Sequence, residues 1–394
     1  MFEEELNPPE QQSNLCQSEQ SKYQSLEEDE VQQDGDGKVT DRHAITSTSN
    51  STSSTFSSCC MKMCSARKRE QHENQMSSQV LACSLIVSTS TDNEETSNDG
   101  SSYHETKKDL DLDIDSDSDH HYLQRQLSEI DRTKPVIILC HGYLSWRNQM
   151  LIANLAARLS SELSCHTLRF DFSGCGHSSG VWRYADYEGD CRDLERVVRF
   201  VEGGGNDGNE HGYGVGSGLN CRVACVLGHS QASTGVMQFR ELDWNRTGKK
   251  RLYVNLAGRF TVSGDFMPER TFTEEQCKLL KDVGKFQVVR RGETGDRMLE
   301  VTLDACQARN AYDLSAAVNA KGLEHIKMLT IHGDADQYVP VENAYKFDEV
   351  IPHHTLCIIN GADHNFNGLR YMDDLVAAIS SFVRTNAKYN AIAF

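Results

Sequence analysis

The stretch RVACVLGHSQASTGV, residues 222–236, decides how the rest of the chain is read. It begins with the apolar run 223–227, turns at the pentapeptide GHSQA, and continues with small residues that can open a helix. A serine at the apex of a tight turn between a strand and a helix is the arrangement that a nucleophile elbow requires. Because the turn forces an unusual backbone conformation on Ser230, the residues two positions away must be small, and here they are Gly228 and Ala232. The usual pattern, G-x-S-x-G, ends in glycine, so the remaining chain has to decide between a nucleophile and an ordinary loop serine.

Apolar runs alternate with helical patterns on both sides of this stretch. The run 135–142, PVIILCHG, is continuous and ends in glycine, which is typical of a buried parallel strand. Further strands are expected at 166–172, 251–258, 325–333 and 355–360, and helices at 148–163, 187–202, 305–320, 341–350 and 369–386. This alternation predicts an α/β fold with a mostly parallel sheet covered by helices on both faces, in one domain over residues 133–394.

The first third of the chain has a different composition. The formal net charge of the protein is −18, and residues 1–132 carry 27 Asp and Glu against 11 Lys and Arg. Residues 47–58 are of low complexity, and residues 109–119 alternate acids with Leu, Ile or Ser. Such a segment buries too little apolar area to offset its chain entropy, so we predict a disordered, acidic, Ser/Thr-rich tail over 1–132. Its apolar run, 79–88, is either a docking segment or an isolated strand, and the tail could recruit a protein partner.

Composition also excludes several classes of function. Residues 133–394 are close to neutral, which argues against nucleic-acid binding, because that requires clustered Lys and Arg. The chain opens with the acidic MFEEELNPPE and contains no run of 18 apolar residues, so neither a secretory signal nor an integral membrane segment is expected. The 14 cysteines form no spaced framework, and several lie within apolar runs. We therefore predict a cytoplasmic protein with reduced thiols.

A nucleophilic serine needs a histidine base and a carboxylate that orients the base. In a fold of this kind both partners follow the serine, the acid first, each just beyond a later strand. The segment GDADQYVP follows the strand 325–333 and offers Asp334 and Asp336; the place of Asp336 before a Val-Pro pair favours it. His364, in GADHNF beyond the last strand, is the predicted base. The other candidates, His141, His229, His353 and His354, have weaker positions.

Acyl transfer also needs two N–H donors for the oxyanion. One should be the backbone N–H of Gln231, the residue after the nucleophile. The second should come from the loop after the strand 135–142, and we assign it to the backbone N–H of Tyr143.

Several motifs together resemble those of the α/β-hydrolase superfamily. They are CHGYLSWRNQ, LRFDFSGCGHSSG, GHSQAS, GDADQYVP and INGADHNF, in that order. More narrowly, they are similar to the cinnamoyl/feruloyl-esterase-like and serine-aminopeptidase S33-like group. The resemblance covers about residues 133–386. It implies an α/β-hydrolase fold, a catalytic set of Ser230, Asp336 and His364, and no metal or organic cofactor. It also implies a small cap inserted at about 261–304. Within that stretch the residues favour a short helix at 273–284 and a hairpin of 286–290 with 298–302.

The leading hypothesis is a serine hydrolase that cleaves a small-molecule carboxylic ester of a small or medium acyl group through an acyl-enzyme. A thioesterase, a short-peptide aminopeptidase or an acyltransferase with the same triad is the first alternative. A non-enzymatic ligand sensor or interaction protein is the second, which the intact triad disfavours. One fold hosts many activities, so the motifs specify the triad better than the substrate.

Overall fold

The computed structural model describes residues 80–88, 108–114, 127–128, 130–203, 218–262, 272–290, 295–319, 323–324 and 326–390. The predictions made for residues 1–79 lie outside these residues. No helix in the described part of the chain is both long and apolar enough to cross a membrane.

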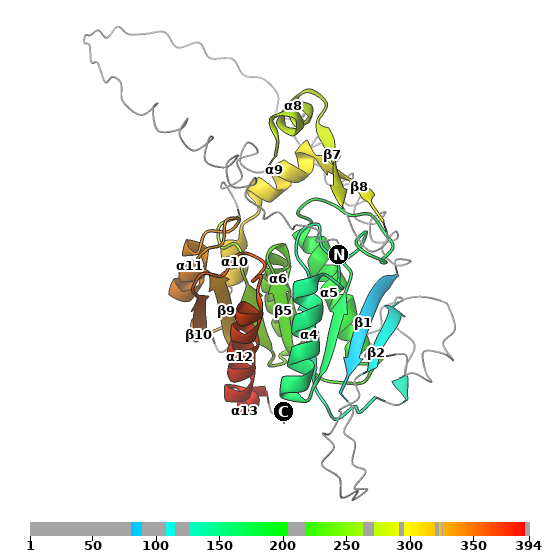
Figure 1. Cartoon of the computed structure of the whole chain (residues 1–394), viewed down its shortest axis with the longest axis vertical. Helices are drawn as coiled ribbons and strands as arrows, with labels where there is room; N and C mark the ends of the chain where they lie inside the picture. The colour runs from blue at the N-terminus through cyan, green and yellow to red at the C-terminus, as the bar shows by residue number, and fades with distance from the viewer. Residues whose placement is uncertain are drawn as a thin grey trace, which may run out of the picture. The chain divides into compact units, whose positions relative to one another are not determined.

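An eight-stranded sheet forms the centre of the fold (Figure 1). The strands lie in the order β10-β9-β6-β5-β3-β4-β1-β2. They are β1 (Leu81–Val87), β2 (Lys108–Ile114), β3 (Val136–Cys140), β4 (His166–Phe170), β5 (Val223–His229), β6 (Leu252–Leu256), β9 (Met328–Gly333) and β10 (His354–Ile359). The strands from β10 to β4 pair in parallel, whereas β1 is antiparallel to both β4 and β2. The predicted mostly parallel sheet is confirmed.

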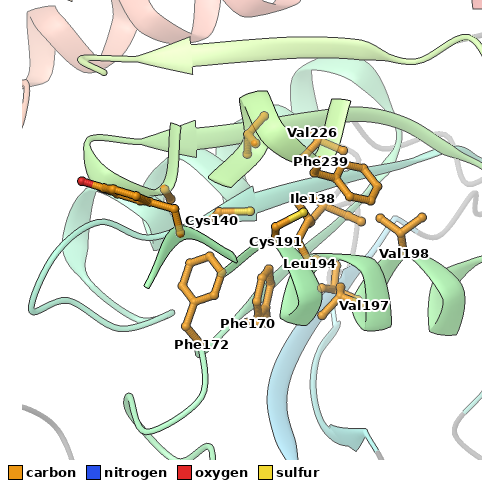
Figure 2. Packing of buried hydrophobic residues seen from close by; sticks show 14 of the residues in the cluster. Ile138, Cys140, Phe170, Phe172, Cys191, Leu194, Val197, Val198, Val226 and Phe239 are labelled. Atoms are coloured by element: carbon orange, nitrogen blue, oxygen red, sulfur yellow. The ribbon is translucent and has the colours of Figure 1, made fainter. Parts of the chain in front are cut away.

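Helices cover both faces of the sheet, and each face has its own apolar core. On one face, α4 (Met150–Leu163) packs beside α12 (Leu369–Thr385), as Figure 1 shows. On the other, α5 (Tyr187–Val201) packs against α6 (Gln231–Thr247). Figure 2 shows this second core, in which Leu194 and Val197 of α5 lie near Ile138 of the sheet. The same core also takes in side chains of α10 (Leu314–Val318) and α11 (Glu342–Val350). The helix α9 (Leu303–Ala311) precedes α10, and the short α13 (Ala387–Asn390) follows α12.

Two strands lie in the segment that was predicted to be a disordered tail, so the boundary at residue 132 was wrong. Every residue of β1 is buried, and its sequence, LACSLIV, is part of the one apolar run noted in that segment. In β2, KDLDLDI, Leu110 and Leu112 are buried, whereas Asp109 and Asp111 are exposed. This is the period-two pattern of a strand with one buried face, which the average composition of the segment had concealed.

The acids of β2 are paired rather than merely solvated. The Asp109 carboxylate lies 2.6 Å from the guanidinium of Arg169 in β4, and Asp111 lies 3.4 Å from that of Arg147. The Ser84 hydroxyl of β1 also donates to Asp111, at 2.5 Å. The bases that balance these acids come from residues 133–394, so the two parts of the chain are not electrostatically separate.

Asp171 joins β1 to the loop that follows β4. Its fully buried carboxylate accepts the N–H groups of Arg147 (2.6 Å) and His177 (2.9 Å) and pairs with the Arg147 guanidinium. Its carbonyl accepts the Ser178 hydroxyl at 2.6 Å, and that hydroxyl oxygen in turn accepts the N–H of Ala82 at 2.9 Å. The glycine-rich motif after β4 therefore fixes β1 in the sheet through these hydrogen bonds.

A small subdomain is inserted between β6 and α9. It contains α8 (Glu274–Asp282) and the antiparallel strands β7 (Lys285–Arg290) and β8 (Arg297–Thr302), close to the predicted helix and hairpin. Thr273 and Gln276 form a capping box that fixes the start of α8. An aromatic chain joins this insertion to the loop after β3: Tyr143 to Tyr184 (5.7 Å between ring centroids), Tyr184 to Phe272 (5.8 Å) and Phe272 to Phe286 (4.7 Å).

If β1 belongs to the folded domain, truncating one of its side chains must destabilise the protein. We expect Leu85→Ala to lower the free energy of unfolding by about 2–5 kcal/mol, because the Leu85 side chain is fully buried. The exposed Leu369→Ala is the matched control. Urea denaturation measures both; an unchanged midpoint for Leu85→Ala would mean that β1 does not form part of the core.

Candidate active site

Ser230 lies alone between β5 and α6, with the backbone conformation of an elbow. Its φ is 55° and its ψ is −118°, a combination that is strained for a residue other than glycine. A Cβ at Gly228 would lie 2.8 Å from the backbone C and O of Ala232, so position 228 must remain glycine. Ala232 is buried, and its methyl group is accommodated at the position where the usual pattern has glycine.

The structure brings Ser230, His364 and Asp336 together from three loops. The Ser230 Oγ lies 2.8 Å from Nε2 of His364, which follows β10. The His364 Nδ1 lies 2.7 Å from Oδ2 of Asp336, which follows β9. Asp334, the competing acid, instead accepts the N–H of Gly361 at 2.6 Å. In this arrangement His364 Nδ1–H donates to the carboxylate, and Nε2 is free to accept the serine proton.

The Asp336 carboxylate is fully buried and held from several sides. Burial alone would raise its pKa, but hydrogen bonds from His332, His364 and the Val339 N–H outweigh burial and lower the pKa below the ordinary value. Its Oδ1 accepts the N–H groups of Tyr338 and Val339 at 2.8 and 2.9 Å. Asp336 therefore remains ionised beside His364.

His332 is a site residue that sequence reasoning missed. It lies in β9, fully buried, with Nε2 2.8 Å from the carbonyl of Val339 and 3.3 Å from the Asp336 carboxylate. A histidine inside an apolar strand carries no signal of its own in the sequence. Its position four residues before the predicted acid, at the end of the same strand, was the only available clue.

His229, the variable residue of the elbow, supports His364 without competing as a base. Its Nε2–H donates to the backbone carbonyl of His364 at 3.0 Å. Burial, followed by the nearby His364, lowers the pKa of His229 to about 4. His229 is therefore neutral at physiological pH and adds no charge next to the base.

The two predicted oxyanion donors flank the serine. Gln231 is the first residue of α6, so its N–H has no acceptor within the helix. Tyr143 follows Gly142, where a Cβ would lie only 3.1 Å from the Ser230 Cβ. The loop after β3 thus approaches the serine as closely as its backbone allows.

A narrow pocket of about 30 Å³ extends from this loop, room for about two water molecules. Gly142, Tyr143 and Gln231 line one part of it, and Asp190 of α5 lines another. Asp190 accepts a hydrogen bond from the Gln231 side chain at 3.2 Å. Burial, reinforced by the neighbouring Asp186 and Asp193, raises the pKa of Asp190 to about 8 despite this hydrogen bond. The described residues of the inserted subdomain do not line this pocket.

A model of the alpha/beta hydrolase family matches residues 137–378. The chain belongs to this family. The superfamily resemblance inferred from the motifs is thereby confirmed. No curated protein matches this α/β-hydrolase.

Solved structures similar to this α/β-hydrolase include Est1E from Butyrivibrio proteoclasticus with ferulic acid bound. It is 17% identical over 65% of this chain and 90% of its own, with a TM-score of 0.47. The Pyrococcus furiosus esterase Pf2001 is 15% identical over 64% of this chain and 83% of its own, with a TM-score of 0.44. The alpha/beta hydrolase domain-containing protein 10 from mouse is 17% identical over 65% of this chain and 92% of its own, with a TM-score of 0.43.

The raised pKa of Asp190 predicts a pH-dependent effect of Asp190→Asn on stability. Between about pH 4 and 8 the unfolded chain releases this proton while the folded chain keeps it, so the wild type loses stability as pH rises through that window. One such proton contributes at most about 1.4 kcal/mol per pH unit. The melting temperature of Asp190→Asn minus that of wild type should therefore increase from pH 5 to pH 8.

Thermal unfolding of both proteins across pH 5–9 measures this difference. The same substitution at the exposed Asp304 is the control for an effect of the amide itself. A difference between Asp190→Asn and wild type that does not vary with pH would contradict the prediction.

Proposed function

We propose that this α/β-hydrolase is a serine hydrolase that cleaves carboxylic esters of small or medium acyl groups. The observation that carries the proposal is the continuous relay from Ser230 Oγ through both nitrogens of His364 to Asp336, at 2.8 and 2.7 Å. Both distances lie within the range for proton transfer between a nucleophile, its base and the orienting acid. Family membership supports the same reaction class.

The reaction begins when the Ser230 Oγ attacks the ester carbonyl and its proton passes to Nε2 of His364. The ionised Asp336 stabilises the imidazolium that forms. The carbonyl oxygen becomes an oxyanion, for which the backbone N–H groups of Tyr143 and Gln231 are the proposed donors. His364 then gives its proton to the departing alcohol, which leaves Ser230 acylated. Water, deprotonated by His364, attacks the acyl-enzyme in the same geometry and releases the acid.

The nucleophile is tested with a fluorophosphonate probe on the full chain. The wild type should be labelled at Ser230, whereas Ser230→Ala should not be labelled and should lose at least about 10⁴-fold in kcat on p-nitrophenyl butyrate. Ser381→Ala, at an exposed serine of α12, should behave as wild type. Equal labelling of Ser230→Ala and wild type would show that the proposed nucleophile is wrong.

The acid is tested by comparing two aspartates of one loop. Asp336→Asn should lower kcat by about 10⁴-fold, because an amide at this position no longer selects the required tautomer of His364. Asp334→Asn should keep kcat within a few-fold, since Asp334 contacts the Gly361 N–H and not His364. Steady-state kinetics on p-nitrophenyl butyrate measure both, and the reverse ranking would exchange their roles. Acyl-CoA thioesters and aminoacyl amides, tested in parallel, should react more slowly than the ester.

A further inference from the structure

Arg290, the last residue of β7, carries a buried guanidinium that nothing in the described chain neutralises. The residue is 1% exposed. Its Nε and both terminal nitrogens have no hydrogen-bond partner, and none of the described acids forms an ion pair with it. Buried charges in proteins are otherwise paired, because an uncompensated charge in the interior costs several kcal/mol. This group is therefore an exception that needs an explanation.

The guanidinium lies at the junction between the inserted subdomain and the loop that holds the proposed oxyanion donor. Its Cζ is 6.0 Å from the ring centroid of Trp146, three residues beyond Tyr143. Phe286, four residues earlier in β7 and therefore on the same face of the strand, belongs to the aromatic chain that leads to Tyr143. Arg290 thus shares the face of the hairpin that packs toward the active-site loop.

The charge of Arg290 also reaches the pocket beside the serine. Burial lowers the pKa of His141, and Arg290 adds to that effect, against the opposing influence of Asp171 and Gly142. Burial raises the pKa of Cys175, and Arg290 counteracts part of that rise. Both His141 and Cys175 line the pocket that starts at Gly142. Arg290 is therefore a cation whose charge acts on both lining groups, although Asp171 has the larger effect at His141 and Asp190 the larger effect at Cys175.

The turn around Trp146 buries further polar groups without partners. The Ser145 Oγ and the Gln149 Oε1 have no hydrogen-bond partner. Gln149 is also the N-cap of α4, whose first turn carries no acidic residue and no side-chain cap. The hydroxyl and the uncapped N-terminus of this 14-residue helix favour a negatively charged group, whereas the Gln149 Oε1 is an acceptor and does not.

We infer that Arg290 is an anion-recognition residue, and that the preferred substrates are esters that carry a carboxylate in addition to the scissile ester. This rests on the proposed esterase function. A planar carboxylate matches the forked guanidinium and accepts two parallel hydrogen bonds from it. The carboxylate belongs either to the acyl group or to the alcohol, and both sources have the same chemistry at Arg290.

Two pairs of substrates distinguish these sources. For the acyl side, the monoester of p-nitrophenol with glutarate is compared with p-nitrophenyl valerate. For the alcohol side, 4-carboxyphenyl butyrate is compared with 4-carbamoylphenyl butyrate. Within at least one pair, wild type should prefer the charged ester by about 10-fold or more in kcat/KM. Arg290→Met should lower kcat/KM on that ester by about 100-fold, the range of a charge-assisted hydrogen bond, and keep the neutral one within a few-fold.

Arg297, paired with Arg290 across the hairpin and half-buried, provides the matched control, since Arg297→Met removes a guanidinium from the same rung. That variant should retain the preference for the charged ester. Arg290→Lys keeps the charge but not the fork, and should lie between wild type and Arg290→Met. Equal kcat/KM for charged and neutral esters in both pairs, unchanged by Arg290→Met, would overturn the inference.

Stability supplies a readout that does not depend on turnover. Without ligand, Arg290→Met should melt at a higher temperature than wild type, because it replaces an unpaired buried charge with an apolar side chain. A lower melting temperature, together with unaltered substrate preference, would assign Arg290 a structural role and overturn the inference.

Binding can be measured separately from catalysis in the Ser230→Ala background. Glutarate should raise the melting temperature of Ser230→Ala but not that of Ser230→Ala with Arg290→Met. If glutarate binds in this way while no ester of either kind is hydrolysed by wild type, the anion site stands and the proposed esterase function falls. In the opposite case, wild type hydrolyses esters without preferring charged ones, and glutarate does not raise the melting temperature through Arg290. The proposed esterase function then stands and the anion site falls.

Discussion

The left-handed backbone conformation of Ser230 is the constraint on which the rest of the site depends. A non-glycine residue at φ 55° and ψ −118° is held there only when its surroundings leave no alternative. The serine N–H donates to the carbonyl of Leu256 in β6 at 2.8 Å, and the start of α6 lies against Gly228. The strain lifts the hydroxyl above the carboxyl ends of the strands, where the loops after β3, β9 and β10 can reach it. The same close approach recurs at Gly333, where a Cβ would lie 2.1 Å from the carbonyl of Ala362.

Burial and hydrogen bonding then determine which groups around this serine are ionised and which are neutral. Asp336 is kept ionised by donors that outweigh burial, whereas His229 is kept neutral because burial dominates there. Asp190, on the far side of Gln231, keeps its proton at neutral pH for the same reason. Asp336 therefore supplies the carboxylate that contacts His364, on the side of Nδ1. In the proposed reaction, the Asp336 carboxylate would favour the imidazolium form of His364.

The parts of this site that sequence predicts are those encoded by local geometry. Ser230, Asp336 and His364 each follow a strand within a short motif, so strand-end chemistry identified them, and the structure brings them together as expected. His332 and Asp190 could not be found in that way, because their roles depend on which strand or helix face meets the triad. A strand at 79–88 was one of two interpretations, but its place in the sheet was missed, as was β2. The composition of residues 1–132 hid both segments, and their partners, Arg147, Arg169 and Ser178, lie much later in the chain.

Arg290 extends the argument from the triad to the substrate. Elsewhere in the described chain, buried arginines are compensated: Arg251 pairs with Asp243 and Glu202, Arg147 pairs with Asp171, and Arg240 donates to the carbonyls of Ala317 and Val318. Carboxylates thus neutralise Arg251 and Arg147, whereas Arg240 has only sulfur and carbonyl acceptors for its terminal nitrogens and none for its Nε. The exception lies beside the loop of Tyr143, on the inserted hairpin that is built onto the sheet by an aromatic chain. The ligand inferred above would bring the missing charge to that place, just as the proposed reaction would account for the strain at Ser230.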